Sequence, residues 1–201
     1  MGFDDSIVVV LAIGTSLASI FFSAISSALS HHYKSSVEWS LVIPLSIGMI
    51  IGAVIGAEYA SSLTSYTLKW IVTIFLFIIG LEMIMELTQK LANSGKGFLS
   101  LAKYTLPVHG SWIGLLSSVI GIGGGSFTTP LLIAGGYNIR IGIGTAAACG
   151  VPIAAAGSVS YIYFGQTNIN LPIGTMGYVF WPAVLYISLA SIFTANLGAK
   201  N

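Results

Sequence analysis

Six long runs of uncharged, mostly apolar residues divide this chain, and each is long enough for a helix that crosses a membrane. About 20 apolar residues are needed to cross roughly 30 Å of hydrocarbon as a helix. Of the 201 residues, 55% are hydrophobic and 6% are charged, which leaves too few polar groups to cover a soluble globule. We therefore predict an all-α, polytopic transmembrane helical bundle. The predicted spans are approximately Ser6–Ser30, Ser40–Ala60, Tyr66–Leu87, Leu106–Gly135, Ile141–Phe164 and Gly174–Leu197.

The charges and the single cysteine argue against several classes of function. The formal net charge is +1 and Lys and Arg do not cluster, so the chain offers no basic surface to nucleic acid. Cys149 has no second cysteine with which to form a disulfide or a thiolate metal site. Neither an H-E-x-x-H nor a C-x-x-C pattern occurs. We predict a protein that is not an enzyme and that needs no cofactor or metal.

Charged residues between the predicted spans indicate an orientation in the membrane. When successive connections are placed alternately on two sides, most lysines fall on one side, which the positive-inside rule assigns to the cytoplasm. His31 and His32 are then expected in a short cytoplasmic loop, and the N-terminus is expected outside. The predicted cytoplasmic side carries Lys34, Lys90, Lys96 and Lys103, and the opposite side carries Asp4, Asp5, Lys69, Arg140 and Lys200.

One apolar run is interrupted near its middle by glycines. The stretch "VIGIGGGSFTTPLL" covers Val119–Leu132 and places Pro130 a few residues after the glycines. Each glycine costs a helix roughly 1 kcal/mol relative to alanine, and proline removes a hydrogen-bond donor. An unbroken helix over Leu106–Gly135 would also be roughly 45 Å long, more than the bilayer core requires. We predict two half-helices joined by an irregular turn.

A break at this depth favours a binding site for a small solute. Lipid cannot satisfy unwound backbone, which therefore survives only when it is packed in protein or lines a wet cavity. A half-helix that starts near Ser126 would aim its free N–H groups and positive dipole end at the break, which favours an anion with several oxygens. Alternatively, the glycines only let another helix pack closely. The predicted site residues here are Gly121, Gly123, Gly124, Gly125, Ser126, Thr128 and Thr129.

The sequence also contains an internal repeat. "LAIGTSLAS" at Leu11–Ser19 returns as "IGIGTAAAC" at Ile141–Cys149, with 130 residues between Gly14 and Gly144. This spacing favours a duplicated half-transporter over a solenoid.

Gly48, Gly52 and Gly56 fall four residues apart and predict a helix-packing face. That face either joins the two halves or joins two protomers in a homo-oligomer.

The two motifs together resemble the TauE/SafE family of sulfite and organosulfur anion exporters. The resemblance covers nearly the whole chain and is carried by the G-x-G-G-G…T-x-P break and by the duplicated G-T-[SA] helix start. It implies two matching halves, each opening with a glycine-broken helix, and about eight spans. Counterparts of the first broken helix and of the final span are missing from this sequence. We expect a first half at residues 1–87, a cytoplasmic linker at 88–105 and a second half at 106–201.

The resemblance adds residues to the predicted site. The helices that carry the repeated motif face the broken helices in this family, so Gly14, Gly144 and the hydroxyls of Thr15, Ser16 and Thr145 are expected to contact the solute. The alternative is that these hydroxyls cap a helix or bond to the preceding turn.

The resemblance implies a multi-pass protein of the cell membrane. Its implied function is to export sulfite or a short organosulfonate from the cytoplasm by alternating access. The expected partners are this small anionic solute and the lipid bilayer. A passive anion channel and a non-transporting membrane partner subunit remain alternatives.

Overall fold

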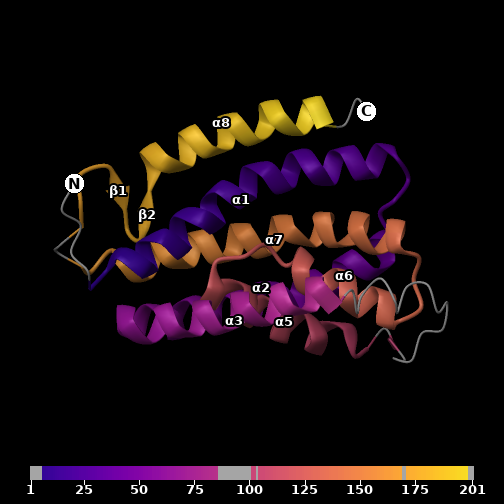
Figure 1. Cartoon of the computed structure of the whole chain (residues 1–201), viewed down its shortest axis with the longest axis horizontal. Helices are drawn as coiled ribbons and strands as arrows, with labels where there is room; N and C mark the ends of the chain where they lie inside the picture. The colour runs from indigo at the N-terminus through magenta and orange to yellow at the C-terminus, as the bar shows by residue number, and fades with distance from the viewer. Residues whose placement is uncertain (1–5, 86–100, 103, 169–170, 199–201) are drawn as a thin grey trace.

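The computed structural model describes residues 6–85, 101–102, 104–168 and 171–198 and shows an elongated bundle of helices (Figure 1). This confirms the predicted all-α bundle. Helices α1 and α7 lie side by side in its middle, with α8 beside α1 and with α2 between α7 and α5. The elements are α1 (Val8–Tyr33), α2 (Trp39–Ser62), α3 (Ser65–Met85), α5 (Leu106–Ile120), α6 (Gly125–Ala134), α7 (Ile139–Gly165), β1 (Thr175–Met176), β2 (Val179–Phe180) and α8 (Trp181–Gly198).

Four of the described helices, α1, α2, α3 and α7, are long and apolar enough to cross a membrane. The outward-facing side chains of this bundle are large and apolar. Ile47 and Ile51 on α2 are 55% and 52% exposed, and Phe77 on α3 is 72% exposed. An apolar surface of this extent suits contact with lipid rather than water.

The predicted break in the helix over Leu106–Gly135 is confirmed, because α5 ends at Ile120 and α6 begins at Gly125. The half-helices have 15 and 10 residues, which gives lengths of about 22 and 15 Å. Neither half is long enough to cross the bilayer core alone.

The two half-helices form a re-entrant hairpin instead of one broken span. Gly48 of α2 lies against Pro107, and Gly56, two turns later, lies against Leu115, so α5 runs parallel to α2. The chain then turns back, and Gly135 at the end of α6 lies against the segment just before α5. The hairpin therefore enters and leaves at the same end of the bundle, and the prediction that residues 106–135 cross the membrane is wrong.

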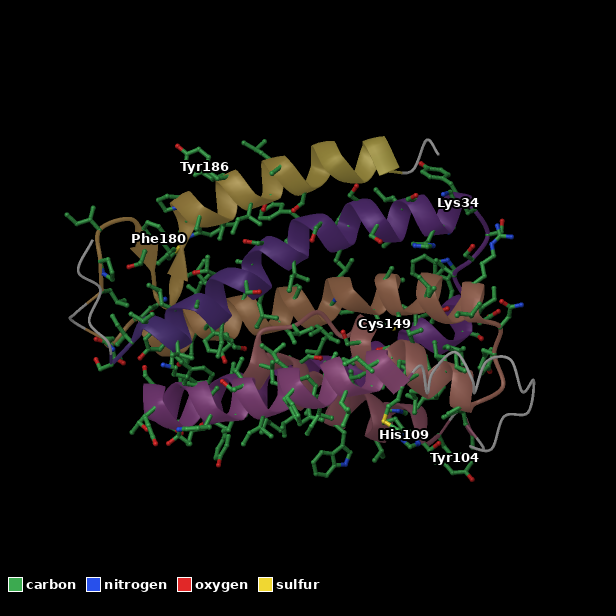
Figure 2. The ribbon with its side chains drawn as sticks, in the orientation of Figure 1. Lys34, Tyr104, His109, Cys149, Phe180 and Tyr186 are labelled. Carbon is green, nitrogen blue, oxygen red and sulfur yellow. The ribbon has the colours of Figure 1, made fainter. Side chains whose placement is uncertain are left out.

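This hairpin corrects the predicted sidedness. Arg140 at the start of α7 donates to the carbonyl of Lys34 (2.8 Å) and to the hydroxyl of Ser36 (2.9 Å), so it lies at the Lys34 end and not at the opposite one. Figure 2 shows Lys34 at one end of the bundle and Phe180 at the other. Moving Arg140 strengthens the positive bias of the predicted cytoplasmic side. The assignments of Asp4, Asp5, Lys90, Lys96, Lys103 and Lys200 lie outside the described residues.

Two predicted boundaries are also wrong. His31 and His32 belong to the last turn of α1 and not to a loop, and the indole N–H of Trp39 donates to Nδ1 of His32 (3.3 Å). The last predicted span was expected to start at Gly174, but a short antiparallel β-hairpin precedes α8 there. Gly177 at its turn has φ +55° and lies against the carbonyl of Ile162, a conformation and a contact that only glycine permits without strain.

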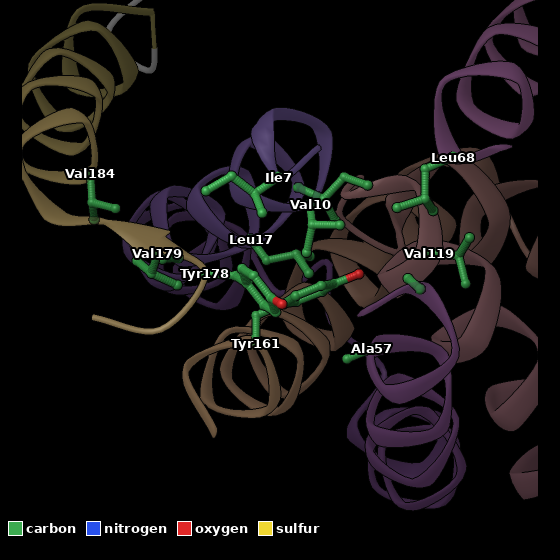
Figure 3. Close-up of a cluster of buried hydrophobic side chains, with 13 residues drawn as sticks. Ile7, Val10, Leu17, Ala57, Leu68, Val119, Tyr161, Tyr178, Val179 and Val184 are labelled. Carbon is green, nitrogen blue, oxygen red and sulfur yellow. The ribbon is translucent and has the colours of Figure 1, made fainter. Parts of the chain in front are cut away.

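The β-hairpin fills the space between α1 and α7 at one end of the bundle. The N–H of Tyr178 donates to the carbonyl of Tyr161 on α7 (3.1 Å). Figure 3 shows the two tyrosine rings side by side next to Leu17 of α1. Tyr161, Leu17 and Val179 are fully buried, so this cluster fixes the connection to α8 relative to both central helices.

The predicted glycine face on α2 joins α2 to α5 within one chain. A Cβ atom at any of its three glycines would collide with a main-chain carbonyl oxygen of α5, and the same holds in reverse for two glycines of α5. Because this face is buried inside the chain, it is not free to form a homo-oligomer. The contacts pair Gly48 with Pro107, Gly52 with Ser111, Gly56 with Leu115, Gly110 with Leu45 and Gly114 with Met49.

We predict that Gly52→Ala lowers the free energy of unfolding by at least about 1 kcal/mol, because the added methyl must displace the Ser111 carbonyl. The matched control is Gly80→Ala on α3, where a Cβ meets no atom within 4 Å. Thermal unfolding of the detergent-solubilised protein measures both. Equal midpoints for the two variants would contradict the interlocked packing.

We also predict that the starts of α2 and α7 share one membrane side. In a Cys149→Ala background, cysteines at Tyr33 and Ile139 should react with a membrane-impermeant maleimide from the same side, and a cysteine at Ser62 from the other side. Labelling of Tyr33→Cys and Ile139→Cys from opposite sides would contradict the re-entrant hairpin.

Candidate functional site

The glycine break leaves a group of main-chain amides without partners. Gly121 ends α5 with φ +79°, and its N–H and that of Ile122 both donate to the carbonyl of Ser117 (2.9 and 3.1 Å). Within the described part of the chain, the N–H groups of residues 123–126 donate to no other main-chain group. They form the amino end of α6, where the helix dipole adds partial positive charge.

The start of α6 is partly open at its surface. A Cβ on Gly125 would meet no atom within 4 Å, and Ser126 is exposed. Gly124 is different, since a side chain there would collide with Ile153 of α7. The open face of the break is therefore at Gly125 and Ser126, and Gly124 is held against the protein.

The two predicted threonines of α6 are placed differently from the amides. Thr128 is fully buried, and its hydroxyl donates to the carbonyl of Gly124 (2.7 Å), so that proton is already used. Thr129 is half-buried, and its methyl group faces Gly142 at the start of α7. Thr128 stabilises the first turn of α6 and gives no donor to a solute.

Helix α1 closes one side of the break. The hydroxyl of Ser16 donates to the carbonyl of Gly121 (2.8 Å). Ile13 lies against Gly121, and Ile20 against Gly123. Of the predicted α1 residues, Ser16 is therefore the one brought to the break, and it positions the main chain there.

Gly14 and Thr15, the first Gly-Thr pair, both contact the connection before α8. A Cβ on Gly14 would collide with the carbonyl of Tyr178. The hydroxyl of Thr15 accepts from the N–H of Phe180 (2.9 Å) and donates to the carbonyl of Leu11 (2.6 Å). No proton of Thr15 is left for a solute, which favours the bond to the preceding turn over substrate contact.

The second Gly-Thr pair makes matching contacts with the connection before α2. A Cβ on Gly144 would collide with the carbonyl of Ser36, and the fully buried hydroxyl of Thr145 accepts from the N–H of Glu38 (3.0 Å). Each copy of the motif thus contacts the connection that precedes a helix of the other predicted half. The geometry gives both pairs a structural role.

A groove of about 490 Å³ between α1 and α8 is the other concave surface beside these residues. The α1 hydroxyls that line it include Thr15, Ser19 and Ser23. Ser19 donates to the carbonyl of Thr15 (2.9 Å) and Ser23 to that of Ile20 (3.1 Å). Since these protons are used within α1, they are not available to an anion in the groove.

The sequence reasoning missed the two serines at the end of α5. The hydroxyls of Ser117 and Ser118 are fully buried and have no hydrogen-bond partner among the described residues. A serine in an apolar helix normally bonds to its own preceding turn, so no sequence pattern distinguishes these two serines. The described residues also contain no group of three His, Cys, Asp or Glu side chains that could hold a metal.

Apolar helices around a re-entrant helix with free amides define a class, that of integral membrane proteins that admit a solute into the bundle. Comparison with known proteins agrees. The family model described as Sulfite exporter TauE/SafE matches residues 3–201, and the chain belongs to this family of membrane transporters. The family predicted from the sequence is thereby confirmed.

Two curated relatives are similar along nearly the whole chain. A probable membrane transporter protein from Haemophilus influenzae is 32% identical over 196 residues, which cover 98% of this chain and 73% of the relative. The probable membrane transporter protein YdhB from Bacillus subtilis is 27% identical over 191 residues, covering 94% of this chain and 73% of the relative. No solved structure matches the chain significantly.

We predict that Thr145→Val lowers the free energy of unfolding by about 1–3 kcal/mol, because the N–H of Glu38 loses its acceptor. Thr145→Ser should restore most of the loss. Thr73→Val on the exposed side of α3 is the control. Thermal unfolding separates the roles, since a residue that only contacts the solute would change transport and leave the unfolding midpoint in place.

Proposed function

We propose that this protein exports a small oxygen-bearing anion, such as sulfite or a short organosulfonate, and binds it at the amino end of α6. The observation that carries the proposal is the set of unpartnered amides at residues 123–126, at the tip of a re-entrant hairpin. The sulfur chemistry is taken from the description of the family, and the binding chemistry from the amides.

The charge around the break supports an anion over a cation. Neither α5 nor α6 contains an Asp or Glu. Two carbonyl groups beside the break are used, because Ser117 O accepts two amides and Gly121 O accepts from Ser16. The start of α6 presents N–H donors at the positive end of a helix dipole, the arrangement that binds sulfate-like anions elsewhere.

Alternating access requires the break to face each side of the membrane in turn. The interlocked glycines of α2 and α5 argue that these two helices move together, carrying the break with them. The contact that then changes is the lighter one to α1, made by the Ser16 hydrogen bond and by Ile20. On this proposal the moving bodies are not the two halves of the sequence.

We propose a multi-pass arrangement in the cell membrane, with the Lys34 and Arg140 end in the cytoplasm. That end carries the two described cations that are joined through the loop before α2. It is also the end from which the hairpin enters, so the anion meets the re-entrant tip after passing a positively charged surface.

The test is Gly125→Leu. A Cβ at Gly125 meets no atom within 4 Å, and we expect the leucine side chain to block the approach to the free amides, so export of labelled sulfite should fall at least about tenfold, as expected when several hydrogen bonds are lost. Gly80→Leu on α3 is the matched control and should export normally. Proteoliposomes loaded with sulfite, sulfoacetate or thiosulfate measure the rates.

Full export by folded Gly125→Leu would contradict a site at the break. Counterflow distinguishes a carrier from a channel, because only a carrier exchanges labelled anion inside for unlabelled anion outside against the gradient of label. Conductance without counterflow would replace the exporter with a passive anion channel, and neither activity would favour a partner subunit.

A further inference from the structure

The last turn of α5, just before the break, holds a hydroxyl that the protein leaves unused. Ser117 is fully buried, and its Oγ has no hydrogen-bond partner among the described residues. Ser19 and Ser23 of α1, by comparison, donate to carbonyls of their own helix. A buried hydroxyl without a partner is unfavourable unless something else accepts its proton.

Ser117 lies on the face of α5 that meets Gly124 at the start of α6. Ser117 follows Ile113 by one turn, so the two side chains share a face of the helix. On that face Ile113 Cγ2 lies 3.5 Å from the position of a Cβ on Gly124. Helical side chains lean toward the amino end of their helix, which brings the Ser117 hydroxyl back over the turn that Gly124 contacts.

Ser118 provides a contrast on the neighbouring face. It is equally buried, but it lies on the side of α7. A Cβ on Gly157 would be 3.7 Å from Ser118 Oγ, and the hydroxyl of Tyr161 donates to the Ser118 carbonyl (3.0 Å). Tyr161 and Leu17 belong to one buried cluster, in which they lie close together (Figure 3).

We infer that Ser117 is a substrate-contacting residue that donates its hydroxyl proton to an oxygen of the anion held by the α6 amides. This inference rests on the proposed site at the break and extends it from α6 to α5. The amides and the hydroxyl come from two helices that meet at the turn, so they reach two different oxygens of one solute. Such a pair of donors selects a polyatomic oxyanion over a halide.

The experiment compares Ser117→Ala with Ser118→Ala in the complete chain. Export of labelled sulfite gives KM and kcat, and the shift of the thermal midpoint on adding sulfite gives binding independently of transport. Ser117→Ala should raise the KM for sulfite at least about tenfold, the effect of losing one hydrogen bond to a charged group, and Ser118→Ala should leave it unchanged. The midpoints of both variants without sulfite should equal that of the wild type.

Equal KM values for the wild type and a folded Ser117→Ala variant would overturn the role of Ser117 and leave the site at the break intact. If Ser117→Ala does not accumulate, Ser117→Cys keeps the volume and weakens the donor, and its KM decides the same question. If the wild type neither exports sulfite nor is stabilised by it, both proposals fail. Stabilisation without export overturns only transport, and the loss of that stabilisation in Ser117→Ala then decides the role of the serine.

Discussion

The close contact between glycines and main-chain carbonyl oxygens determines how this bundle is arranged. Helices in lipid gain little from burying apolar side chains against one another, so small residues that let backbones approach become the main source of association. Here the glycines of α2 fit against the carbonyls of α5 and the reverse, and Gly14 and Gly144 fit against the carbonyls of two connections. The short half-helix α5 is held in the bundle by these contacts, although it does not cross the membrane by itself.

The same contacts limit how the protein can change shape. Two helices that interlock through glycine and carbonyl cannot slide without separating, because each carbonyl occupies the space that a side chain would need. By contrast, α1 meets the break through the hydroxyl of Ser16 and the apolar contact of Ile20. A single hydrogen bond and a methyl contact can be remade after a small movement. The proposed movement therefore separates α2, α5 and the break from α1, and this division cuts across the sequence repeat.

Much of this fold could be predicted from the sequence, and the errors have physical causes. The break followed from the conformational cost of adjacent glycines, and it is present between Ile120 and Gly125. The direction of the chain after the break did not follow, because hydrophobic length gives the amount of helix and not whether it returns to the same side. The side of Arg140 was wrong for that reason alone. The β-hairpin before α8 was hidden because its residues are apolar and continue the hydropathy of the helix.

The site was predictable to the extent that it consists of main chain. Free amides at a helix start follow from the position of the glycines, whereas the use of a hydroxyl depends on which carbonyl lies within reach. The hydroxyls of Thr15 and Thr128 donate to main-chain carbonyls one turn earlier. The hydroxyl of Thr145 accepts from a main-chain N–H just before α2. Sequence alone cannot tell these hydroxyls from a free one such as that of Ser117.

Recognition by main-chain amides, as proposed for this break, has a consequence for selectivity. Amides at a helix start bind a negatively charged group that can reach them. They make no specific contact with the organic part of a solute. The face at Gly125 and Ser126 is open, so a group attached to the anionic centre has room outside the donors. A site of this kind should accept sulfite and a short sulfonate with comparable affinity, and should discriminate instead against cations and against anions too large to enter between α1 and α6. Relative KM values for sulfite, sulfoacetate and a bulky aromatic sulfonate measure this selectivity, and a strong preference among the small anions would mean that side chains outside the break contribute to binding.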